Sequence, residues 1–352
     1  MADAGLDVSV DAAGNLFGRL PGRSRTDEVW AGSHLDSVPQ GGRFDGALGV
    51  VAALEAVERL GRRDRTLAVV AFRDEEGWRF GHGCFGSRAL CGGLSPGELE
   101  TTDDEGVPIA AAVRALGFGP IPEGGWLERP PAAFVELHVE QGPVLAAQDA
   151  PLGVVTSIVG LARLRVAFEG QGGHAGTTPM DGRTDALVAA ARFVVAVKDA
   201  AEARQPAVAT IGWLTVEPNA ANVIPARVEL LVDARAPKNE TLSALVDEIE
   251  ATAEGDEVER VGRMQPAEMH PDLRSTLRAA LEELGLPAAE LPSGAGHDAG
   301  ILAAAGVPAA MLFVRSGAGG VSHSPDEHSD DADVALGVDA LERALRRLAT
   351  PP

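Results

Sequence analysis

The chain alternates short apolar runs with segments in which apolar positions recur every three or four residues. The runs at Thr66–Phe72, Ala133–Val139 and Ala309–Val314 predict buried strands. Residues 46–60 carry valine and leucine at helical spacing, and Gly61 follows as a natural helix end. Strands that alternate with helices are typical of an α/β fold, and such sheets bind ligands at the carboxyl ends of their strands.

The pattern changes after Pro151. Residues 152–263 predict the order strand, strand, helix, strand, strand and helix, and within 227–235 apolar residues alternate with charged ones. Such alternation indicates a sheet with one covered face. We therefore expect an α/β protein with a discontinuous main domain, 1–152 and 264–352, whose mixed sheet is flanked by helices. The inserted domain, 153–263, is predicted to be an α+β, ferredoxin-like unit that serves as a lid or for dimerisation.

Composition and charge exclude several classes of function. The chain has 52 acidic and 30 basic residues, a formal net charge of -22, so nucleic acids and anionic membranes would be repelled. No apolar run approaches the roughly 20 residues needed to span a bilayer. The two cysteines, Cys84 and Cys91, cannot form a disulfide framework. We expect a cytoplasmic protein with neither a nucleic-acid nor a membrane partner.

Side chains that bind divalent metals lie at or just after the predicted strand ends. Residues two apart on a strand face the same way, so Asp36 can accept the second N–H of the His34 imidazole while the other nitrogen meets a metal. Two histidines, a bridging aspartate, a glutamate and a third histidine would suffice for two metals. The candidate ligands are His34, Asp45, Glu76, His138 and His323.

Each of these residues also has a simpler interpretation. A single strand histidine is more often a hydrogen-bonded structural residue, Asp45 could be a helix N-cap, and Glu75 with Glu76 could begin a solvated helix. Their joint occurrence at strand ends favours the metal site. Two strings that fit a dinucleotide-binding fingerprint, at 81–86 and 294–299, lack the required strand directly before them, and we interpret both as turns.

A set of longer motifs resembles one family, the hydantoinase/carbamoylase-type amidases of the aminoacylase-like dinuclear metallopeptidase superfamily. N-carbamoyl-L-amino-acid hydrolases, allantoate amidohydrolases and β-ureidopropionases belong to it. The motifs occur in family order over nearly the whole chain. They are 32–39 (GSHLDSVP), 41–46 (GGRFDG), 72–77 (FRDEEG), 136–143 (ELHVEQGP), 173–180 (GHAGTTPM), 219–225 (NAANVIP), 233–235 (DAR), 293–299 (SGAGHDA) and 322–327 (SHSPDE).

The resemblance implies two divalent metal ions per subunit, with Asp45 as the bridging ligand. His34 and His138 would complete one site, and Glu76 and His323 the other. Zinc is the default metal, although manganese, cobalt or nickel would suit the same ligands. In typical relatives a further helical segment precedes the point at which this sequence begins, and it carries none of the motif residues.

The resemblance also implies roles around the metals. Glu75 would be the general base toward the metal-activated water and then the acid toward the leaving nitrogen. His174 would stabilise the oxyanion as the lid closes, in relatives often from the partner subunit. The remaining substrate contacts would come from Gln141, Asn222, Arg235 and His297, of which Asn222 and Arg235 would hold the substrate's α-carboxylate.

The expected reaction is hydrolysis of N-carbamoyl-L-amino acids to amino acid, carbon dioxide and ammonia by a homodimer. Allantoate and N-carbamoyl-β-alanine, the substrate of β-ureidopropionase, are alternatives, because both also carry a carboxylate and a ureido nitrogen. A truncated paralogue that binds a ureido acid without turnover is a further alternative, and the intact Glu75 argues against it. A dinuclear aminopeptidase or deacylase is disfavoured by Gln141 and the motif at 173–180.

Overall fold

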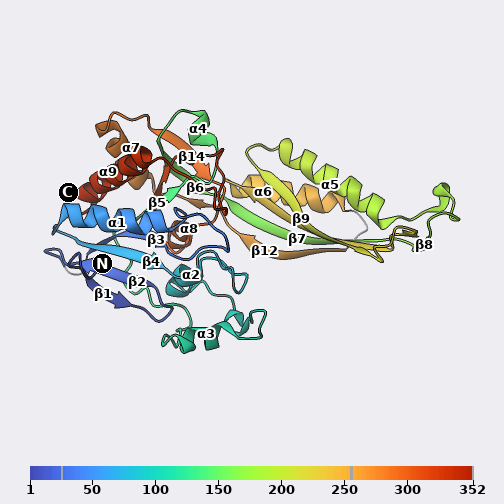
Figure 1. Ribbon diagram of the computed structural model, residues 1–352, viewed down its shortest axis with the longest axis horizontal. Helices are drawn as coiled ribbons and strands as arrows, with labels where there is room; N and C mark the ends of the chain where they lie inside the picture. Colours follow the sequence, from blue (N-terminus) through green and yellow to red (C-terminus); the bar gives the residue numbers. More distant parts are fainter. Residues whose placement is uncertain (25–26, 254–256, 351–352) are drawn as a thin grey trace. The chain divides into compact units, whose positions relative to one another are not determined.

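The computed structural model describes residues 1–24, 27–253 and 257–350. It contains two compact units, Met1–Ile158 with Ala267–Pro352, here called the main unit, and Val159–Pro266, the inserted unit (Figure 1). These divisions lie a few residues beyond the predicted 152 and 263. The reason is that β6 (Leu152–Ile158) and β13 (Ala267–Glu268) pair with each other in the sheet of the main unit.

The main unit is built on a nine-stranded mixed sheet with the order β1-β2-β4-β3-β5-β15-β6-β13, in which β14 also pairs with β6. The strands predicted at Thr66–Phe72, Ala133–Val139 and Ala309–Val314 are confirmed to the residue as β4, β5 and β15. The remaining bounds are β1 (Asp7–Val10), β2 (Leu16–Leu20), β3 (Glu28–His34), β4 (Thr66–Phe72), β5 (Ala133–Val139), β14 (Ala289–Ser293) and β15 (Ala309–Val314).

Four neighbouring strands of this sheet run in the same direction. β3 pairs in parallel with β4 and β5, and β15 pairs in parallel with β5. Their carboxyl ends therefore lie at one edge of the sheet, which is where open α/β sheets place their sites. The segments that follow β3, β4 and β5 carry most of the candidate residues.

Helices cover both faces of the sheet. On one face, buried residues of α1 (Ala47–Leu60), α7 (Pro271–Glu283) and α9 (Asp331–Leu348) form one core with the strands. On the other face, α2 (Phe85–Cys91), α4 (Val144–Ala147) and α8 (Asp298–Ala304) each contribute a leucine or alanine to a second core. The short elements η1 (Glu98–Glu100) and α3 (Ile109–Ala115) follow α2 in the sequence. The helix predicted at 46–60 is confirmed to within one residue as α1.

The inserted unit has a four-stranded antiparallel sheet with the order β12-β7-β11-β9. Buried and half-buried residues alternate along all of β11, as predicted. The elements follow the order strand, helix, strand, strand, helix, strand, which is that of the ferredoxin-like motif. They are β7 (Gly160–Glu169), α5 (Ala186–Glu202), β9 (Val208–Glu217), β11 (Arg227–Ala236), α6 (Asn239–Thr252) and β12 (Glu257–Met264).

Both helices of the inserted unit share a core with the sheet, and a small second sheet lies at one end of the unit. That sheet pairs β8 (Gly173–His174) with β10 (Val223–Ile224), and η2 (Met180–Gly182) follows β8. The role of the inserted unit as a lid or in dimerisation stays a prediction. Among the helices of the described ranges, none has the length and apolar character needed to cross a bilayer.

Candidate metal centre and active site

Five side chains converge at the carboxyl edge of the main sheet. His34 is the last residue of β3, His138 lies near the end of β5, and Glu76 follows β4. Asp45 precedes α1, and His323 lies in the loop between β15 and α9. Residues that are almost 300 positions apart in sequence thus meet because parallel strands end at the same edge.

The Asp45 carboxylate lies between two groups of these side chains. Its Oδ1 is 3.6 Å from Nε2 of His34 and 3.2 Å from Nε2 of His138. Its Oδ2 is 3.4 Å from Nε2 of His323, and that nitrogen is 3.3 Å from Oε2 of Glu76. Each group of three offers ligand atoms within 4.8 Å of one another. One carboxylate oxygen therefore faces each group, which is the geometry that a bridging ligand requires.

The hydrogen bonds of the histidines leave the correct nitrogen available. Nδ1 of His34 lies 3.0 Å from the backbone oxygen of Asp36, and Nδ1 of His138 lies 2.9 Å from that of Val139. A carbonyl can only accept, so Nδ1 carries the proton in each neutral ring and the Nε2 lone pair points toward Asp45.

The contact between Asp36 and His34 differs from the prediction. The backbone carbonyl of Asp36, rather than its carboxylate, is the near partner of His34, because Oδ1 of the carboxylate is 3.7 Å away. The other oxygen, Oδ2, accepts a hydrogen bond from the N–H of Glu76 at 3.1 Å. Asp36 thus contacts both groups of candidate ligands, one through its backbone and the other through its side chain.

Glu327 supports the Asp45 loop, and the sequence did not single it out beyond its motif. This buried carboxylate accepts hydrogen bonds from the backbone N–H groups of Phe44 and Asp45, both at 3.0 Å, and from the hydroxyl of Ser322 at 2.7 Å.

Gly46, the residue after Asp45, packs directly against His34. It adopts a φ of 64°, and a Cβ there would lie 2.3 Å from the His34 ring. Only glycine fits this close approach.

The charges at the centre suit divalent cations. Burial opposes ionisation of Asp45, but when the rings of His138 and His34 are protonated they carry positive charge and donate from Nε2, and this holds the pKa of Asp45 below its usual range. Burial raises the pKa of Glu76, and the nearby Asp45 carboxylate raises it further. Oε1 of Glu76 is buried and has no hydrogen-bond partner among the described residues. An acceptor without a donor, beside imidazole nitrogens and a second carboxylate, is what a metal ion would satisfy.

Glu75 lies beside this centre and is nearly buried. Oε2 is 3.9 Å from Nε2 of His34, and Oε1 accepts from the Cys84 thiol at 3.6 Å. Burial raises the pKa of Glu75 well above its usual range, and the negative charge of Asp298 adds to this effect. A carboxylate that gains protons readily and stands next to a metal site has the properties of a general base.

Gln141 and His297 contact the same centre. Nε2 of Gln141 donates to Oδ2 of Asp45 and to Oγ of Ser322, both at 3.0 Å. The ring of His297 is buried, 4.6 Å from the ring of His138, and its Nε2 lies 2.9 Å from Oγ of Ser293. Burial, followed by the charge of His138, holds the pKa of His297 well below its usual value. His297 is therefore a neutral donor or acceptor. The contacts of Gln141 and His297 with substrate stay predictions.

A buried polar network behind the metal centre was not predicted. Glu136 is fully buried and accepts from Oγ of Ser33 at 2.6 Å and from the N–H of Ala299 at 3.0 Å. Asp298 is also fully buried and accepts from Oγ of Ser87 at 2.5 Å. Apolar periodicity gives no signal for such acids, because they lie inside strands and helix ends that otherwise look like core.

The string at 294–299 needs a correction. We expected no strand before it, but β14 ends at Ser293 and α8 begins at Asp298, so the order is strand, turn and helix. Pro292 inside the strand concealed it. The turn is occupied by His297, and helix α8 begins with the buried Asp298. His297 and Asp298 are buried at this helix start, and the N–H of Ala299 already donates to Glu136, so the dinucleotide interpretation still does not apply.

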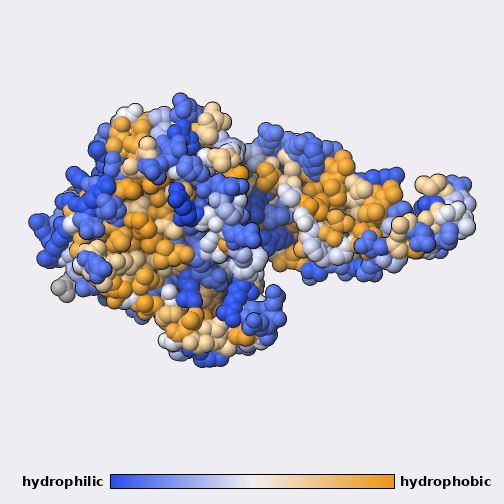
Figure 2. Space-filling model, in the orientation of Figure 1, coloured by the Kyte–Doolittle hydropathy of each residue, from blue (hydrophilic) through white to orange (hydrophobic). Residues whose placement is uncertain are grey.

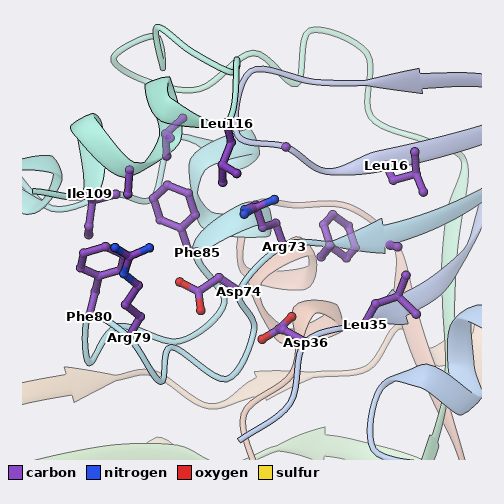
Figure 3. A pocket seen from close by; sticks show the side chains of 15 residues that line it. Leu16, Leu35, Asp36, Arg73, Asp74, Arg79, Phe80, Phe85, Ile109 and Leu116 are labelled. Atoms are coloured by element: carbon purple, nitrogen blue, oxygen red, sulfur yellow. The ribbon is translucent and has the colours of Figure 1, made fainter. Parts of the chain in front are cut away.

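A cavity of about 410 Å³ adjoins the segment that carries Glu75 and Glu76 (Figure 3). Asp36, Arg73 and Asp74 line it together with apolar side chains such as Phe85 and Leu116. Burial, followed by the charge of Asp36, raises the pKa of Asp74 to about 6. The cavity therefore lies beside the metal-binding residues without being formed by them.

Three predicted site residues belong to the inserted unit. His174 and Asn222 are close together, because His174 pairs with Val223 and the backbone oxygen of Asn222 accepts from Ala175 at 3.0 Å. Arg235 lies near the other end of β11, where its Nε donates to Oδ1 of Asp233 at 2.7 Å. β11 begins at Arg227, and eight residues of strand at about 3.3 Å each separate Arg235 from this end by roughly 25 Å. One inserted unit therefore does not bring Arg235 to the same place as His174 and Asn222.

Residues 30–347 match the model of the peptidase family M20/M25/M40, and the chain belongs to this family. The architecture and the metal-binding groups fit this class, whose members are typically dinuclear metal enzymes. The resemblance to hydantoinase/carbamoylase-type amidases is confirmed by the particular relatives that the chain matches.

The N-carbamoyl-L-amino acid amidohydrolase of Geobacillus stearothermophilus is 41% identical over 364 residues, which cover 99% of this chain and 88% of that protein. The allantoate amidohydrolase of Bacillus subtilis (strain 168) is 38% identical, with the same two coverages. A crystal structure of a hydantoinase/carbamoylase family amidase from Burkholderia multivorans matches with a TM-score of 0.90 and 36% identity, covering 100% of this chain and 88% of that one. The chain is therefore an amidohydrolase, an enzyme that acts on carbon–nitrogen bonds other than peptide bonds.

Proposed function

We propose that the protein hydrolyses N-carbamoyl-L-amino acids to the amino acid, carbon dioxide and ammonia. The observation that carries this proposal is the pair of three-residue groups around Asp45, with Glu75 beside them. Relatives named for N-carbamoyl-L-amino acids and for allantoate are similar to this chain over nearly its whole length. Allantoate hydrolysis is therefore the second candidate, followed by hydrolysis of N-carbamoyl-β-alanine.

The residues present fit two divalent metal ions. We infer that His34, Asp45 and His138 hold one ion, and that Asp45, Glu76 and His323 hold the other. Bound cations would polarise the scissile carbonyl and make water more acidic. Zinc is the default, and the nitrogen and oxygen ligands suit manganese, cobalt or nickel as well.

Glu75 would move the proton in this reaction. Its carboxylate would accept a proton from the attacking water and then pass it to the leaving nitrogen, so that the base of the first step is the acid of the second. The raised pKa of Glu75 favours this exchange, because its carboxyl group can hold the proton between the two steps. Asp36 and Gln141 would keep His34, Glu76 and Asp45 in place.

We further propose that the enzyme is a homodimer whose active site takes residues from both chains. Asn222 and Arg235 were both expected to hold the substrate's α-carboxylate, yet β11 separates them by roughly 25 Å within one inserted unit. One chain can therefore supply only one of them to a given substrate. A second chain would supply the other, and His174 would accompany Asn222.

The inserted unit has a surface suited to a second copy of the chain. β9 is an edge strand of its sheet, and Val208, Trp213 and Leu214 are exposed on it. Exposed valines and a leucine continue this apolar surface along α5 (Figure 2). An unpaired, apolar edge strand readily pairs with another chain. The same pairing in two identical copies would give a symmetric dimer.

The test of the proposed reaction is ammonia release from N-carbamoyl-L-amino acids, allantoate and N-carbamoyl-β-alanine, measured side by side. Glu75→Gln is expected to lower kcat by about 10²–10⁴-fold, the usual contribution of a general base. Its metal content by elemental analysis should stay near that of the wild type, whereas Glu76→Gln should lose metal. Unchanged turnover in Glu75→Gln would refute the role of Glu75. No ammonia from any substrate would refute the proposed reaction.

A further inference from the structure

The segment that carries Glu75 and Glu76 has a backbone that needs support. Asp74, directly before Glu75, has a φ of 53°, and Cys84 on the facing segment has a φ of 54°. Residues other than glycine adopt this region at a cost of about 1 kcal/mol or more, so the surrounding structure must hold them there. The hydrogen bonds of residues 73–76 therefore bear directly on where the two carboxylates point.

The first turn of α2 provides part of this support. The N–H groups of Cys84, Phe85 and Gly86 donate to the backbone oxygens of Glu75, Asp74 and Arg73 at 2.7, 3.0 and 2.8 Å. The two segments thus run antiparallel along three consecutive residues. Figure 3 shows the side chains of Asp74 and Phe85 on these two neighbouring segments.

Asn15 joins the two segments to each other. Its side-chain oxygen accepts from the N–H of Arg73 at 3.0 Å, and its side-chain nitrogen donates to the backbone oxygen of Gly86 at 2.9 Å. The same nitrogen donates to Oδ2 of Asp11 at 2.8 Å, and Oδ1 of Asp11 accepts from the N–H of Asn15. Asn15 is fully buried, and these bonds use both its donor hydrogens.

The packing between Asn15 and Gly86 has no room for a further atom. A Cβ on Gly86 would lie 2.0 Å from the side-chain oxygen of Asn15 and 2.7 Å from the nitrogen of Arg73. Only glycine lets the two segments approach so closely. Among the described residues, the Asn15 side chain hydrogen-bonds to Asp11, Arg73 and Gly86, none of which is a candidate metal ligand or a proposed substrate-binding residue. Its influence on those residues must therefore pass through the backbone of residues 73–76.

We propose that Asn15 is a positioning residue: its amide, held by Asp11, fixes residues 73–76 to the first turn of α2 and thereby aims Glu75 and Glu76 at the metal centre. This inference rests on the proposed function for its catalytic consequence, and its structural part stands on the hydrogen bonds alone. Displacement of a catalytic group by about 1 Å can lower the rate by about 10²-fold. The hydrogen bonds that join Asn15 to Asp11 and Gly86 would prevent such a displacement.

The test compares Asn15→Ala with a matched control at the far end of β4, the strand that leads into residues 73–76. Thr66, the first residue of β4, is also buried, accepts from the N–H of Gly22 at 3.1 Å and donates to the oxygen of Ser24 at 3.0 Å. Thr66→Val removes these bonds far along the strand from Glu75. Asp11→Asn is a milder second variant. Its amide oxygen can still accept from the N–H groups of Ala13 and Asn15, whereas Oδ2, which accepts from the Asn15 side chain, is replaced by an NH2 group. All variants are made in the full chain with its metals.

Asn15→Ala is expected to lower kcat at least about tenfold with KM within about threefold of the wild type, and Asp11→Asn to lower kcat by about threefold or more. Thr66→Val should keep kcat within about twofold. Hydrogen exchange, measured by mass spectrometry, should show residues 73–76 of Asn15→Ala exchanging at least about tenfold faster than in the wild type, with β5 unchanged.

Wild-type kcat in Asn15→Ala, or an equal fall in Thr66→Val, would overturn the proposal, as would unchanged exchange at residues 73–76. If Asn15→Ala does not fold, Asp11→Asn decides by the same measurements. If even the wild type releases no ammonia from the three substrates, the proposed reaction fails, and the exchange measurement alone decides whether Asn15 holds this segment.

Discussion

Asp298 offers a prediction about stability in the absence of metal. Its carboxyl group is fully buried, accepts from Oγ of Ser87 on Oδ1, and has no hydrogen-bond partner on Oδ2 among the residues described. Burial, followed by the negative charge of Glu136, raises the pKa of Asp298 from 3.8 to about 8. Asp298→Asn keeps the shape and the acceptor of the protonated form, so the substitution imitates a carboxyl group that never ionises.

The sign of the effect follows from the two pKa values. Because the folded state binds this proton more tightly than the unfolded state, stability is greatest at low pH and falls as the pH rises between about 4 and about 8. One pH unit in this window corresponds to 1.36 kcal/mol, which gives a ceiling of about 6 kcal/mol at pH 8. Water entry and relaxation lower such values for buried groups, and we expect a loss of about 2–4 kcal/mol.

The assay is urea unfolding of the metal-free protein at pH 5, 7 and 8.5. Asp298→Asn should match the wild type within about 1 kcal/mol at pH 5 and exceed its free energy of unfolding by about 2–4 kcal/mol at pH 8.5. With metals bound the difference should shrink, because nearby cations stabilise the ionised carboxylate. A variant that is less stable than the wild type at pH 8.5 without metal would refute the reasoning, since Asp298 would then be a stabilising carboxylate.

Two further predictions concern the bridging ligand and the dimer. Glu327→Ala should weaken metal retention against a chelator by about 10–100-fold, because it releases the N–H groups of Phe44 and Asp45. Glu327→Gln keeps an acceptor and should weaken metal retention less. Equal metal retention in the wild type and both variants would contradict the role of Glu327. Sedimentation should show that the wild type is a dimer. The substitution Trp213→Asp, on the exposed edge strand β9, should convert it to a monomer with little activity. A fully active monomer would exclude a site shared between chains.

The sequence predicted the core of the main unit well because its central strands are apolar on both faces. β4, β5 and β15 are buried at every position, and their bounds match the prediction to the residue. Parallel strands with both faces covered have this continuous pattern. The prediction that His34, Asp45, Glu76, His138 and His323 lie together rested on the strand ends, and the structure brings these five residues together.

The edges of the same sheet gave weaker signals. All four residues of β1 are exposed, so no apolar face marks it as a strand. β14 contains Pro292, which argues against a strand in a single sequence although edge positions tolerate it. Contacts such as that between Glu327 and Asp45, which joins residues 282 positions apart, depend on the final packing. Local pattern therefore identified the ligands, whereas the residues that hold them in place required the structure.

The distribution of the proposed site over the chain separates metal binding from the proposed contacts with the substrate's α-carboxylate and oxyanion. All five candidate ligands, and the residues that hold them, belong to the main unit, whereas His174, Asn222 and Arg235 belong to the inserted unit. Because Arg235 is roughly 25 Å from the end of β11 nearest Asn222, a substrate that needs both must reach two inserted units. Loss of the dimer should then raise KM and lower kcat while the metal content stays intact. Damage to Glu327 should instead lower the metal content while the dimer stays intact.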